Sequence, residues 1–361
     1  MKQKMLIIHP IIAPYRIDFF NSLSETYDCT ICLTWENLHD QTFDYSQIEK
    51  LFRFVPKFLT KKILGYPTGL LKTFRETKPD IILVSECGIV SMLMFLVSRL
   101  CHRKVKVVSM IDDSYDMVVS DNHFTNRHKY AEKIMIPLFD NIICVEPRVT
   151  DYYKKRYHKG IYFPIIADEE LSVLRYKRII PISERYIQDY SLAGRKVILF
   201  VGRLVEIKNV QFVISTLKDI NDPSLRFVIV GSGDYEQTLF CLAKEDDRII
   251  FTGRKEGDEL YAWYNIANIF VLPSYKEPFG AVTNEALIGG CRCLVSNRAG
   301  SQCLIDKTNG KTFDPYDRTS FKTILMEEMS KVQPISSRIE HRASLMNISF
   351  KKAMSNVTHN I

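Results

Sequence analysis

The sequence predicts an α/β protein with two doubly wound parallel-sheet domains. Three observations support this prediction: a length of 361 residues, ten short apolar segments rich in β-branched residues, and helical patterns between them. The ten segments are 5–8, 29–33, 81–84, 105–110 and 142–145, then 197–201, 227–230, 249–251, 269–272 and 293–295. Buried strands that alternate with helices are typical of parallel sheets, and a chain of this length forms about two domains.

The helices expected between these strands have one apolar face. After the strand at 197–201, apolar residues recur at helical spacing; they are Val210, Val213, Ile214, Leu217 and Ile220. The charged, proline-containing stretch 163–194 separates the two sets of strands, and we expect the domain boundary at about residues 165–172. Two such domains place a ligand at the carboxyl ends of the strands, in the cleft between the domains.

The composition is that of an ordinary soluble globular protein, with 46% hydrophobic and 25% charged residues. The nine cysteines are odd in number and lie singly in apolar runs, and Cys29 and Cys32 point to opposite faces of an expected strand, so we expect reduced thiols. The apolar run at 5–8 is too short for a signal peptide, and the longest other run, 88–97, has the length of a buried helix. These observations predict a cytoplasmic protein.

A glycine turn follows the expected strand at 227–230. Gly231 and Gly233 begin a pattern similar to a dinucleotide fingerprint, but Glu236 stands where the third glycine belongs. The pattern therefore argues against a nicotinamide site. It favours a turn at which the backbone approaches a phosphate or a sugar.

The segment 273–287 contains most of the expected chemistry. It leaves the strand at 269–272 through a turn with proline and glycine, and a helix is expected to begin near Gly280. Free backbone N–H groups of residues 280–282 would then favour a phosphate. Glu277 before the turn and Glu285 in the second helical turn offer carboxylates that accept hydrogen bonds from sugar hydroxyls.

A second segment supplies cations at the end of the strand at 197–201. Gly202 is followed by Arg203, which offers a planar fork for phosphate oxygens, and by Lys208, which offers a point charge. Two such cations match the charge of a diphosphate.

These two segments resemble the retaining glycosyltransferases of family 4, which have the GT-B architecture of two Rossmann-like domains. The resemblance rests on Gly202-Arg203-Leu204 through Lys208-Asn209, and on the E-x7-E pattern from Glu277 to Glu285 with Glu-Pro-Phe-Gly intact. It covers essentially the whole second domain and is weaker in the first.

The resemblance implies a role for each matching residue. Arg203 and Lys208 would bind the donor diphosphate, Glu277 the transferred sugar, and Glu285 the nucleotide ribose. Backbone groups would contact sugar and phosphate at Phe279, Gly280, Ala281 and Val282.

The resemblance also implies the domain roles. We expect residues 1–167 to form an acceptor-binding domain and residues 168–345 a nucleotide-sugar-binding domain. We expect residues 346–361 to form a helix that packs back on the first domain. Backbone groups near Arg254 and the turn at Gly231 and Gly233 would recognise the base.

The first domain departs from the family pattern at two places. The loop 9–16 has no glycine, and Arg16 is its candidate for contact with the diphosphate. After the strand at 105–110, Asp112 is the candidate carboxylate on the acceptor side. No D-x-D metal signature occurs, so we expect metal-independent catalysis without a cofactor, and front-face attack of the acceptor as the family implies.

The formal charge of +7 is concentrated in one segment. Residues 50–78 contain eight cations and one acid, Glu76, together with many apolar residues. Two interpretations stand: a basic amphipathic helix that lies on anionic lipid, or a domain helix with solvated lysines. No nucleic-acid partner is expected, since no binding motif accompanies the charges.

We therefore expect a cytoplasmic hexosyltransferase, peripheral on the inner face of the membrane. It would act on a nucleotide sugar and a glycan or lipid-linked acceptor in surface polysaccharide or glycolipid biosynthesis. Two alternatives remain: a sugar-nucleotide epimerase of the same architecture, and a catalytically silent binding protein on the membrane.

Overall fold

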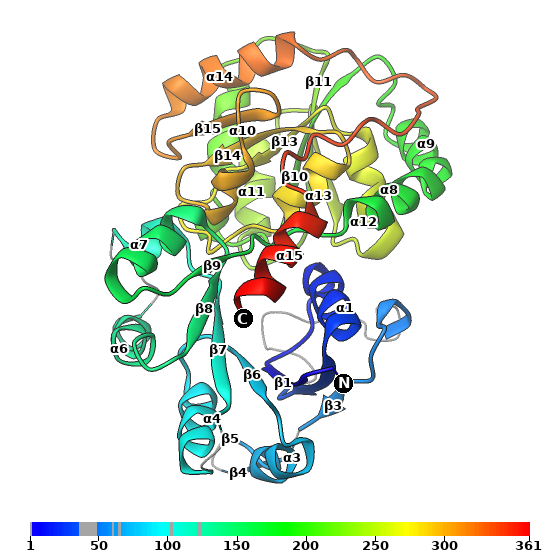
Figure 1. The fold of residues 1–361 in the computed structure, drawn as a ribbon. Helices are drawn as coiled ribbons and strands as arrows, with labels where there is room; N and C mark the ends of the chain where they lie inside the picture. Colours follow the sequence, from blue (N-terminus) through cyan, green and yellow to red (C-terminus); the bar gives the residue numbers. More distant parts are fainter. Residues whose placement is uncertain (1, 36–48, 60, 64–65, 102–103, 121–124) are drawn as a thin grey trace. The chain divides into compact units, whose positions relative to one another are not determined.

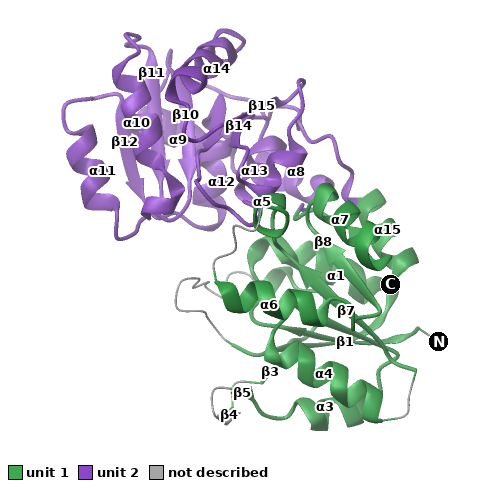
Figure 2. Ribbon diagram, turned by 90° about the vertical axis from the view of Figure 1, so that its left-hand side faces the viewer, with its two compact units in different colours: residues 1–165, 351–361 green, residues 166–350 purple. Residues whose placement is uncertain are grey.

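The computed structural model describes residues 2–35, 49–59, 61–63, 66–101, 104–120 and 125–361. The chain divides into two compact units (Figures 1 and 2). Unit 1 comprises Met1–Ile165 and Lys351–Ile361, and unit 2 comprises Ile166–Phe350. Each unit contains a parallel sheet wound with helices, so the predicted GT-B fold class of two doubly wound α/β units is confirmed.

The sheet of unit 1 has the strand order β3-β2-β1-β6-β7-β8-β9 and is parallel throughout. Its strands are β1 (Lys4–His9), β2 (Asp28–Leu33), β3 (Lys57–Phe58), β6 (Ile81–Ser85), β7 (Lys106–Ile111), β8 (Asn141–Cys144) and β9 (Ile161–Tyr162). β4 (Lys62–Ile63) and β5 (Tyr66–Pro67) form a separate antiparallel pair. The five strands predicted here are present, and the sequence analysis missed only two-residue strands, which are too short to show a pattern.

One face of this sheet is covered by four helices that share its apolar core. They are α3 (Leu70–Thr77), α4 (Ile89–Leu100), α6 (Asn126–Met135) and α7 (Pro147–Tyr157). Figure 2 shows α3, α4 and α6 in one layer in front of the sheet. The remaining helices of unit 1 are α1 (Ile17–Thr26), α5 (Tyr115–Val118) and α15 (Phe350–Asn360).

The last helix of the chain, α15, belongs to unit 1. The Tyr27 hydroxyl donates a hydrogen bond to the Thr358 carbonyl at 3.2 Å, and Lys106 Nζ donates to the Ile361 carbonyl at 2.9 Å. Val357 and Met354 are buried. The end of the chain is therefore part of the first unit's packing.

The sheet of unit 2 has the strand order β12-β11-β10-β13-β14-β15, again parallel. Its strands are β10 (Lys196–Val201), β11 (Leu225–Val230), β12 (Ile249–Gly253), β13 (Ile269–Leu272), β14 (Arg292–Ser296) and β15 (Gly310–Phe313). Its α-helices are α8 (Glu169–Arg178), α9 (Ile180–Asp189), α10 (Val210–Lys218), α11 (Glu236–Ala243), α12 (Gly257–Ile266), α13 (Val282–Ile288) and α14 (Arg318–Ser330). All five strands predicted for this half are present.

The apolar face predicted for α10 is buried in the core of unit 2. Val210, Val213, Ile214 and Leu217 lie on the helix, whereas Ile220 follows its end at Lys218 and is buried as well. The helix ends earlier than the apolar pattern, and the next two residues form tighter turn hydrogen bonds, from Asp219 N–H to the Thr216 carbonyl and from Ile220 N–H to the Leu217 carbonyl.

Among the described residues of 50–78, α3 is the one α-helix. Its Leu70 and Phe74 are buried and its Lys72 and Arg75 are exposed, which agrees with the second interpretation of this segment, a domain helix with solvated cations. The rest forms a 3-10 turn, short strands and loops; residues 60 and 64–65 and the side chains of Lys62 and Ile63 lie outside the described residues.

One expectation for unit 1 was wrong. The apolar run 88–97 forms most of α4, which is not a buried helix, because four of its large apolar side chains are exposed. Among the described residues, no helix combines the length and the apolar character needed to cross a bilayer.

Candidate active site

The parallel sheet of unit 2 brings four of the predicted segments to one edge. β12, β11, β10 and β13 are neighbours in the sheet, so the loops that follow their carboxyl ends lie side by side. Backbone hydrogen bonds connect these loops: Leu204 N–H donates to the Ser232 carbonyl at 2.9 Å, and Tyr275 N–H donates to the Ile207 carbonyl at 2.9 Å. Residues separated by up to 80 positions in the sequence thus form one continuous edge, which we call the donor edge (202–208, 231–233, 253–254 and 273–285).

Glycine at Gly231 and Gly233 allows the loops to approach closely. A Cβ added at Gly231 would lie 1.9 Å from the Gly202 carbonyl oxygen, and one at Gly233 would lie 2.4 Å from the Leu204 carbonyl oxygen. Both glycines have positive φ, which other residues rarely adopt. The glycine turn predicted from the sequence therefore lets the loop after β11 pack against the backbone of the loop after β10.

Lys208 and Glu277 form an ion pair across this edge, from Nζ to Oε2. Lys208 ends a short 3-10 turn (Glu206–Lys208) after β10, whereas Glu277 lies in the loop after β13. Both side chains are more than four-fifths buried. Arg203 lies in the same loop as Lys208 and is exposed. A carboxylate and two cations therefore meet where the neighbouring strands β10 and β13 end.

Backbone hydrogen bonds from Gly300 and Ser301 fix the turn from Glu277 to Val282. Gly300 N–H donates to the Glu277 carbonyl at 3.2 Å, and Ser301 N–H donates to the Phe279 carbonyl at 2.8 Å. Phe279 is buried, and Gly280 has φ +92° with the side chain of Leu272 directly beneath it.

The backbone N–H groups of Gly280, Ala281 and Val282 donate to no acceptor among the described residues. α13 begins at Val282 with Ala281 as its N-cap, close to the predicted start. Three unengaged amides in a row can bind an anion, and a cation beside them strengthens that binding.

Glu285 lies in the first turn of α13. The sequence analysis placed it in the second turn. Its Oε1 accepts from the Tyr261 hydroxyl at 3.2 Å, and its Oε2 accepts from the Tyr264 hydroxyl at 2.8 Å. Burial raises the pKa of Glu285, and the two hydroxyl donors oppose that rise. The carboxylate is held in one orientation, and each oxygen keeps a further lone pair for a ligand.

Arg254 follows β12 at the far side of the donor edge. It forms an exposed ion pair with Glu256. The backbone there joins the same loop system, since Gly231 N–H donates to the Gly253 carbonyl at 3.0 Å.

In unit 1, the carboxyl ends of β1, β6, β7 and β8 form a second edge, the acidic edge (9–16, 86, 112–116, 128–132 and 146). Here Arg16 pairs with Asp112, from Nη2 to Oδ1. The Arg16 side chain is only 2% exposed, whereas that of Asp112 is 32% exposed. Of the two residues predicted in this unit, Asp112 is open to a ligand, and Arg16 acts on it as a buried partner.

His9 ends β1 beside this pair. Its Nδ1 donates to the Ile11 carbonyl oxygen. Burial, and next the nearby charge of Arg16, lower the pKa of His9 to about 4. The imidazole is therefore neutral near pH 7.

The sequence analysis missed the main cluster of the acidic edge, formed by Glu86, Asp113, His128 and Glu132. Burial raises the pKa of Glu86 well above its ordinary value, and burial raises that of Glu132 to about 7. Hydrogen bonds to Asp113 and Glu132 raise the pKa of His128 to about 11. The signal that could have found Glu86 is its position, a carboxylate directly after a buried strand, as Asp112 is.

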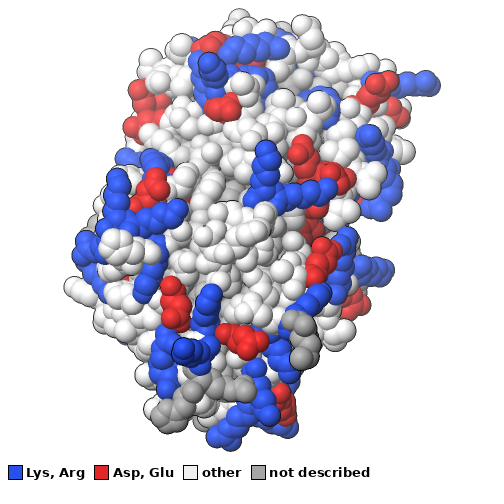
Figure 3. Space-filling model, in the orientation of Figure 1, with Lys and Arg blue, Asp and Glu red and all other residues white. Residues whose placement is uncertain are grey.

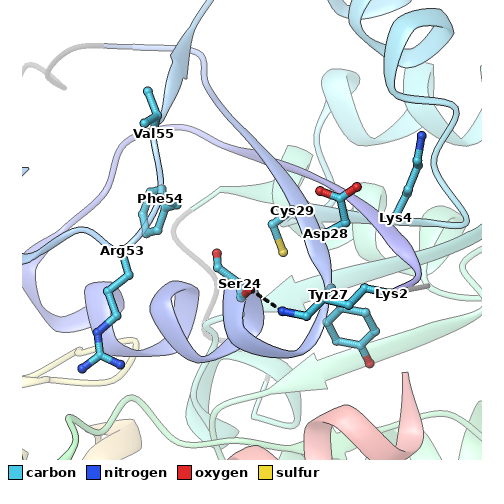
Figure 4. Close-up of a pocket in the computed structure, with 9 residues that line it drawn as sticks. All are labelled: Lys2, Lys4, Ser24, Tyr27, Asp28, Cys29, Arg53, Phe54 and Val55. Atoms are coloured by element: carbon cyan, nitrogen blue, oxygen red, sulfur yellow. Dashed lines mark hydrogen bonds between the residues drawn. The ribbon is translucent and has the colours of Figure 1, made fainter.

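A surface hollow lies at the opposite, amino-terminal edge of the unit 1 sheet (Figure 4). It is lined by nine residues from the starts of β1 and β2, the end of α1 and the loop before β3: Lys2, Lys4, Ser24, Tyr27, Asp28, Cys29, Arg53, Phe54 and Val55. Lys2 Nζ donates to the Ser24 carbonyl across it at 3.4 Å. None of the predicted site residues lines this hollow, because all of them stand at carboxyl edges.

Comparison with known proteins shows what unit 2 is similar to. Residues 183–340 match the family model described as glycosyl transferases group 1, and this region lies within unit 2. The predicted resemblance to glycosyltransferases is confirmed there, and the assignment to family 4 stays a prediction.

Two curated relatives illustrate the similarity. An uncharacterized glycosyltransferase of Methanocaldococcus jannaschii is 37% identical over 109 residues, which are 29% of this chain and 28% of that protein. Spore coat protein SA of Bacillus subtilis is 27% identical over 186 residues, 48% of each protein. The chain thus matches less than half of the length of these relatives.

Solved structures share the fold at low identity. HepE of Anabaena, solved in complex with UDP and glucose, has a TM-score of 0.74 at 16% identity, with 99% of this chain and 98% of that chain covered. The lipopolysaccharide outer core galactosyltransferase WaaB has a TM-score of 0.63 at 15% identity, with 99% and 95% covered.

Proposed function

We propose that this chain, whose second unit carries a glycosyl transferases group 1 domain, is a retaining hexosyltransferase. It moves a hexose from a nucleotide-diphosphate sugar to a glycan or lipid-linked acceptor, in surface polysaccharide or glycolipid biosynthesis. The observation that carries this proposal is the Lys208–Glu277 pair beside Arg203 and the three unengaged amides of residues 280–282. UDP and glucose bound to the Anabaena protein support a nucleotide-sugar donor.

The donor edge supplies what departure of a diphosphate requires. Negative charge grows on the diphosphate as the sugar leaves, and Lys208, Arg203 and the amides of residues 280–282 stabilise that charge. Glu277 accepts hydrogen bonds from hydroxyls of the sugar. The acceptor hydroxyl attacks from the face that the diphosphate leaves, and a diphosphate oxygen accepts its proton. This step uses no enzyme nucleophile, no cofactor and no metal at the donor edge.

The remaining predicted residues complete the binding of both substrates. Glu285, oriented by its two tyrosines, accepts hydrogen bonds from the ribose. Backbone groups at Gly202, Gly231, Gly233 and Arg254 contact the nucleotide. Asp112 binds the acceptor from unit 1, and its ion pair with Arg16 holds it in one orientation.

A helix face of unit 1 supports a lipid-linked acceptor and contact with an anionic membrane on the cytoplasmic side. Ile89, Leu93, Leu96 and Leu100 form an exposed apolar stripe on α4. This helix contains no acidic residue.

The neighbouring helices α3 and α6 also expose apolar and basic side chains. Tyr130 and Ile134 on α6 and Leu71 on α3 are exposed large side chains in the same layer. Lys72, Arg75, Arg127 and Lys133 are exposed cations on the same two helices. Figure 3 shows Lys and Arg side chains gathered at the lower end of unit 1, where Figure 1 places α3. Each basic residue near an anionic surface contributes about 1 kcal/mol to binding.

A thermal-stability screen with UDP-, GDP- and ADP-hexoses tests the proposed donor. A donor at about 100 times its dissociation constant adds about 2.7 kcal/mol to the stability. We expect one nucleotide class to stabilise the wild type but not Lys208→Met, whereas Lys218→Met, an exposed lysine on α10, keeps the effect. The proposal is contradicted if none of the donors stabilises the protein. It is also contradicted if incubation of the protein with the donor yields an epimerised sugar nucleotide.

Sedimentation with vesicles tests the membrane contact separately. We expect binding to phosphatidylglycerol vesicles and not to phosphatidylcholine vesicles. Lys72→Gln combined with Lys133→Gln should weaken binding by about 30-fold, from about 1 kcal/mol per lysine. Lys218→Gln in unit 2 is the matched control. Unchanged binding of the double variant excludes this surface.

A further inference from the structure

The acidic edge of unit 1 contains a partly buried cluster that the proposed sugar transfer does not use. Glu86 follows β6, Asp113 follows β7, and His128 lies in the first turn of α6. One ligand atom from each of these three residues lies within 4.8 Å of the other two. The parallel sheet creates this convergence, since β6 and β7 are neighbours and α6 is the crossover that follows β7.

The cluster contains more carboxyl groups than basic groups. His128 Nε2 lies 2.7 Å from Asp113 Oδ2 and 3.5 Å from Glu132 Oε1. Asp113 and Glu132 are 4% and 5% exposed. With Glu86, whose ligand atom lies within 4.8 Å of those of Asp113 and His128, three carboxyl groups lie close to one imidazole. Carboxylates buried this close together ionise together only when a cation joins them.

The Glu86 carboxyl group provides a second observation, because one of its oxygens lacks a hydrogen-bond partner among the described residues. Its Oε1 accepts from the Asp112 backbone N–H at 3.0 Å. Its Oε2 is fully buried and has no hydrogen-bond partner among the described residues. A buried carboxylate oxygen without a partner is unfavourable, so a water molecule or an ion is expected beside Oε2.

We propose that Glu86, Asp113 and His128 bind a divalent cation, with Glu132 oriented against His128. Two carboxylates and one imidazole suit a first-row transition ion such as Mn²⁺, which accepts both oxygen and nitrogen ligands. Binding displaces the proton that His128 shares with Asp113, because a metal-bound imidazole is neutral. The site belongs to unit 1 alone and is distinct from the donor edge of unit 2.

The cation would organise the acceptor side of the enzyme. Glu86 is linked to the Asp112 backbone, and Asp112 is the residue proposed to meet the acceptor. A cation that fixes Glu86 and Asp113 also fixes the loop from Asp112 to Ser114 between them. The proposed role is positioning of this loop.

Titration of the tag-free full chain with Mn²⁺, followed by electron paramagnetic resonance, tests the site. Mn²⁺ is the suitable probe because Cys101 and Cys241 are exposed thiols that would bind Zn²⁺ elsewhere. We expect one saturable Mn²⁺ per chain in the presence of excess Mg²⁺. Nitrogen modulation in the spin-echo spectrum should report His128 and disappear in His128→Gln.

A pair of variants distinguishes Mn²⁺ binding at this site from nonspecific binding to other carboxylates. Glu86→Gln, which keeps the shape of the side chain, should weaken Mn²⁺ binding by at least about tenfold. Asp140→Asn, an exposed carboxylate paired with Arg99, should leave it unchanged. Three results overturn the proposal: no saturable Mn²⁺ site in the wild type, equal binding by Glu86→Gln, or binding without nitrogen modulation. None of these measurements uses a sugar, so they are independent of the proposed transfer.

Discussion

The donor edge of unit 2 and the acidic edge of unit 1 stand at equivalent places in two similar sheets, yet they offer opposite chemistry. The donor edge has glycines at Gly202, Gly231 and Gly233, unengaged amides and two cations. The acidic edge has no glycine in the loop 9–16 and gathers carboxylates with one buried arginine. A shared topology thus sets where loops meet, and the residues in them decide what is bound.

The difference also shows how each edge is held together. In unit 2 the loops touch through backbone, which requires glycine where a Cβ would collide with a carbonyl oxygen. In unit 1 they touch through side-chain ion pairs and carboxylate hydrogen bonds, which tolerate a Cβ but depend on charge. Steric substitutions should therefore damage the donor edge most, and charge substitutions the acidic edge.

The largest effect is expected for Gly231→Ala. The new Cβ would lie 1.9 Å from the Gly202 carbonyl oxygen, so one of the two loops must move. We expect a loss of at least about 3 kcal/mol in the free energy of unfolding, measured by urea denaturation. The matched control is Gly253→Ala, which also has positive φ but no neighbour within 4 Å, and it should lose only about 1 kcal/mol. Equal losses would mean that the close approach of loops is unimportant.

Next in size is the loss of sugar transfer in Glu277→Gln. The amide keeps the shape but loses the charge that pairs with Lys208 and accepts from the sugar. We expect kcat/KM to fall by about 100-fold with the fold preserved, which is about 2.7 kcal/mol of transition-state stabilisation. Initial rates with the donor found in the screen, and circular dichroism as a control of folding, measure this. Near-normal turnover would remove Glu277 from the site.

Arg16→Met tests the dependence of the acidic edge on charge. The substitution keeps part of the buried stem but leaves Asp112 without its cation. We expect a loss of about 2 kcal/mol in stability, less than for a fully buried pair because Asp112 is partly solvated. Arg53→Met breaks an exposed ion pair with Glu25 and should lose under about 0.5 kcal/mol. If both variants lose the same amount, the Arg16 pair is no stronger than a surface pair.

The smallest effect is a pH dependence from His9. Its pKa is about 4 in the folded protein against 6.5 ordinarily, so between these values the unfolded chain binds a proton that the folded chain does not. Stability should therefore fall as the pH drops from about 6.5 toward 4, by about 1 kcal/mol from pH 7 to pH 5 once solvent screening of a partly exposed ring is allowed for. His9→Gln should flatten this part of the curve relative to the wild type, and parallel curves would contradict the assignment.

Ten strands were predictable because each contains a continuous apolar run, and most of these runs are buried inside their sheet. β12 is the exception, an edge strand whose residues are only partly buried. The strands that were missed, β3, β9 and β15 among them, lie at sheet edges or are too short to show a period. The exposed stripe of α4 was misjudged for a related reason. A helix that is apolar all round looks buried in sequence, and only the packed layer shows that one side of it faces outward.

The sequence by itself determined the fold class, the order of strands along the chain and the residues of the donor edge. These are local matters: strand runs, glycine turns and the segments around Lys208 and Glu277 are each readable within about fifteen residues. Only the tertiary structure decided the pairings. Arg16 with Asp112, Glu285 with its tyrosines, and Glu86 with Asp113 and His128 join residues 20 to 100 positions apart. The reason is physical: the order of parallel strands in the sheet, which no local pattern specifies, decides which loop ends become neighbours.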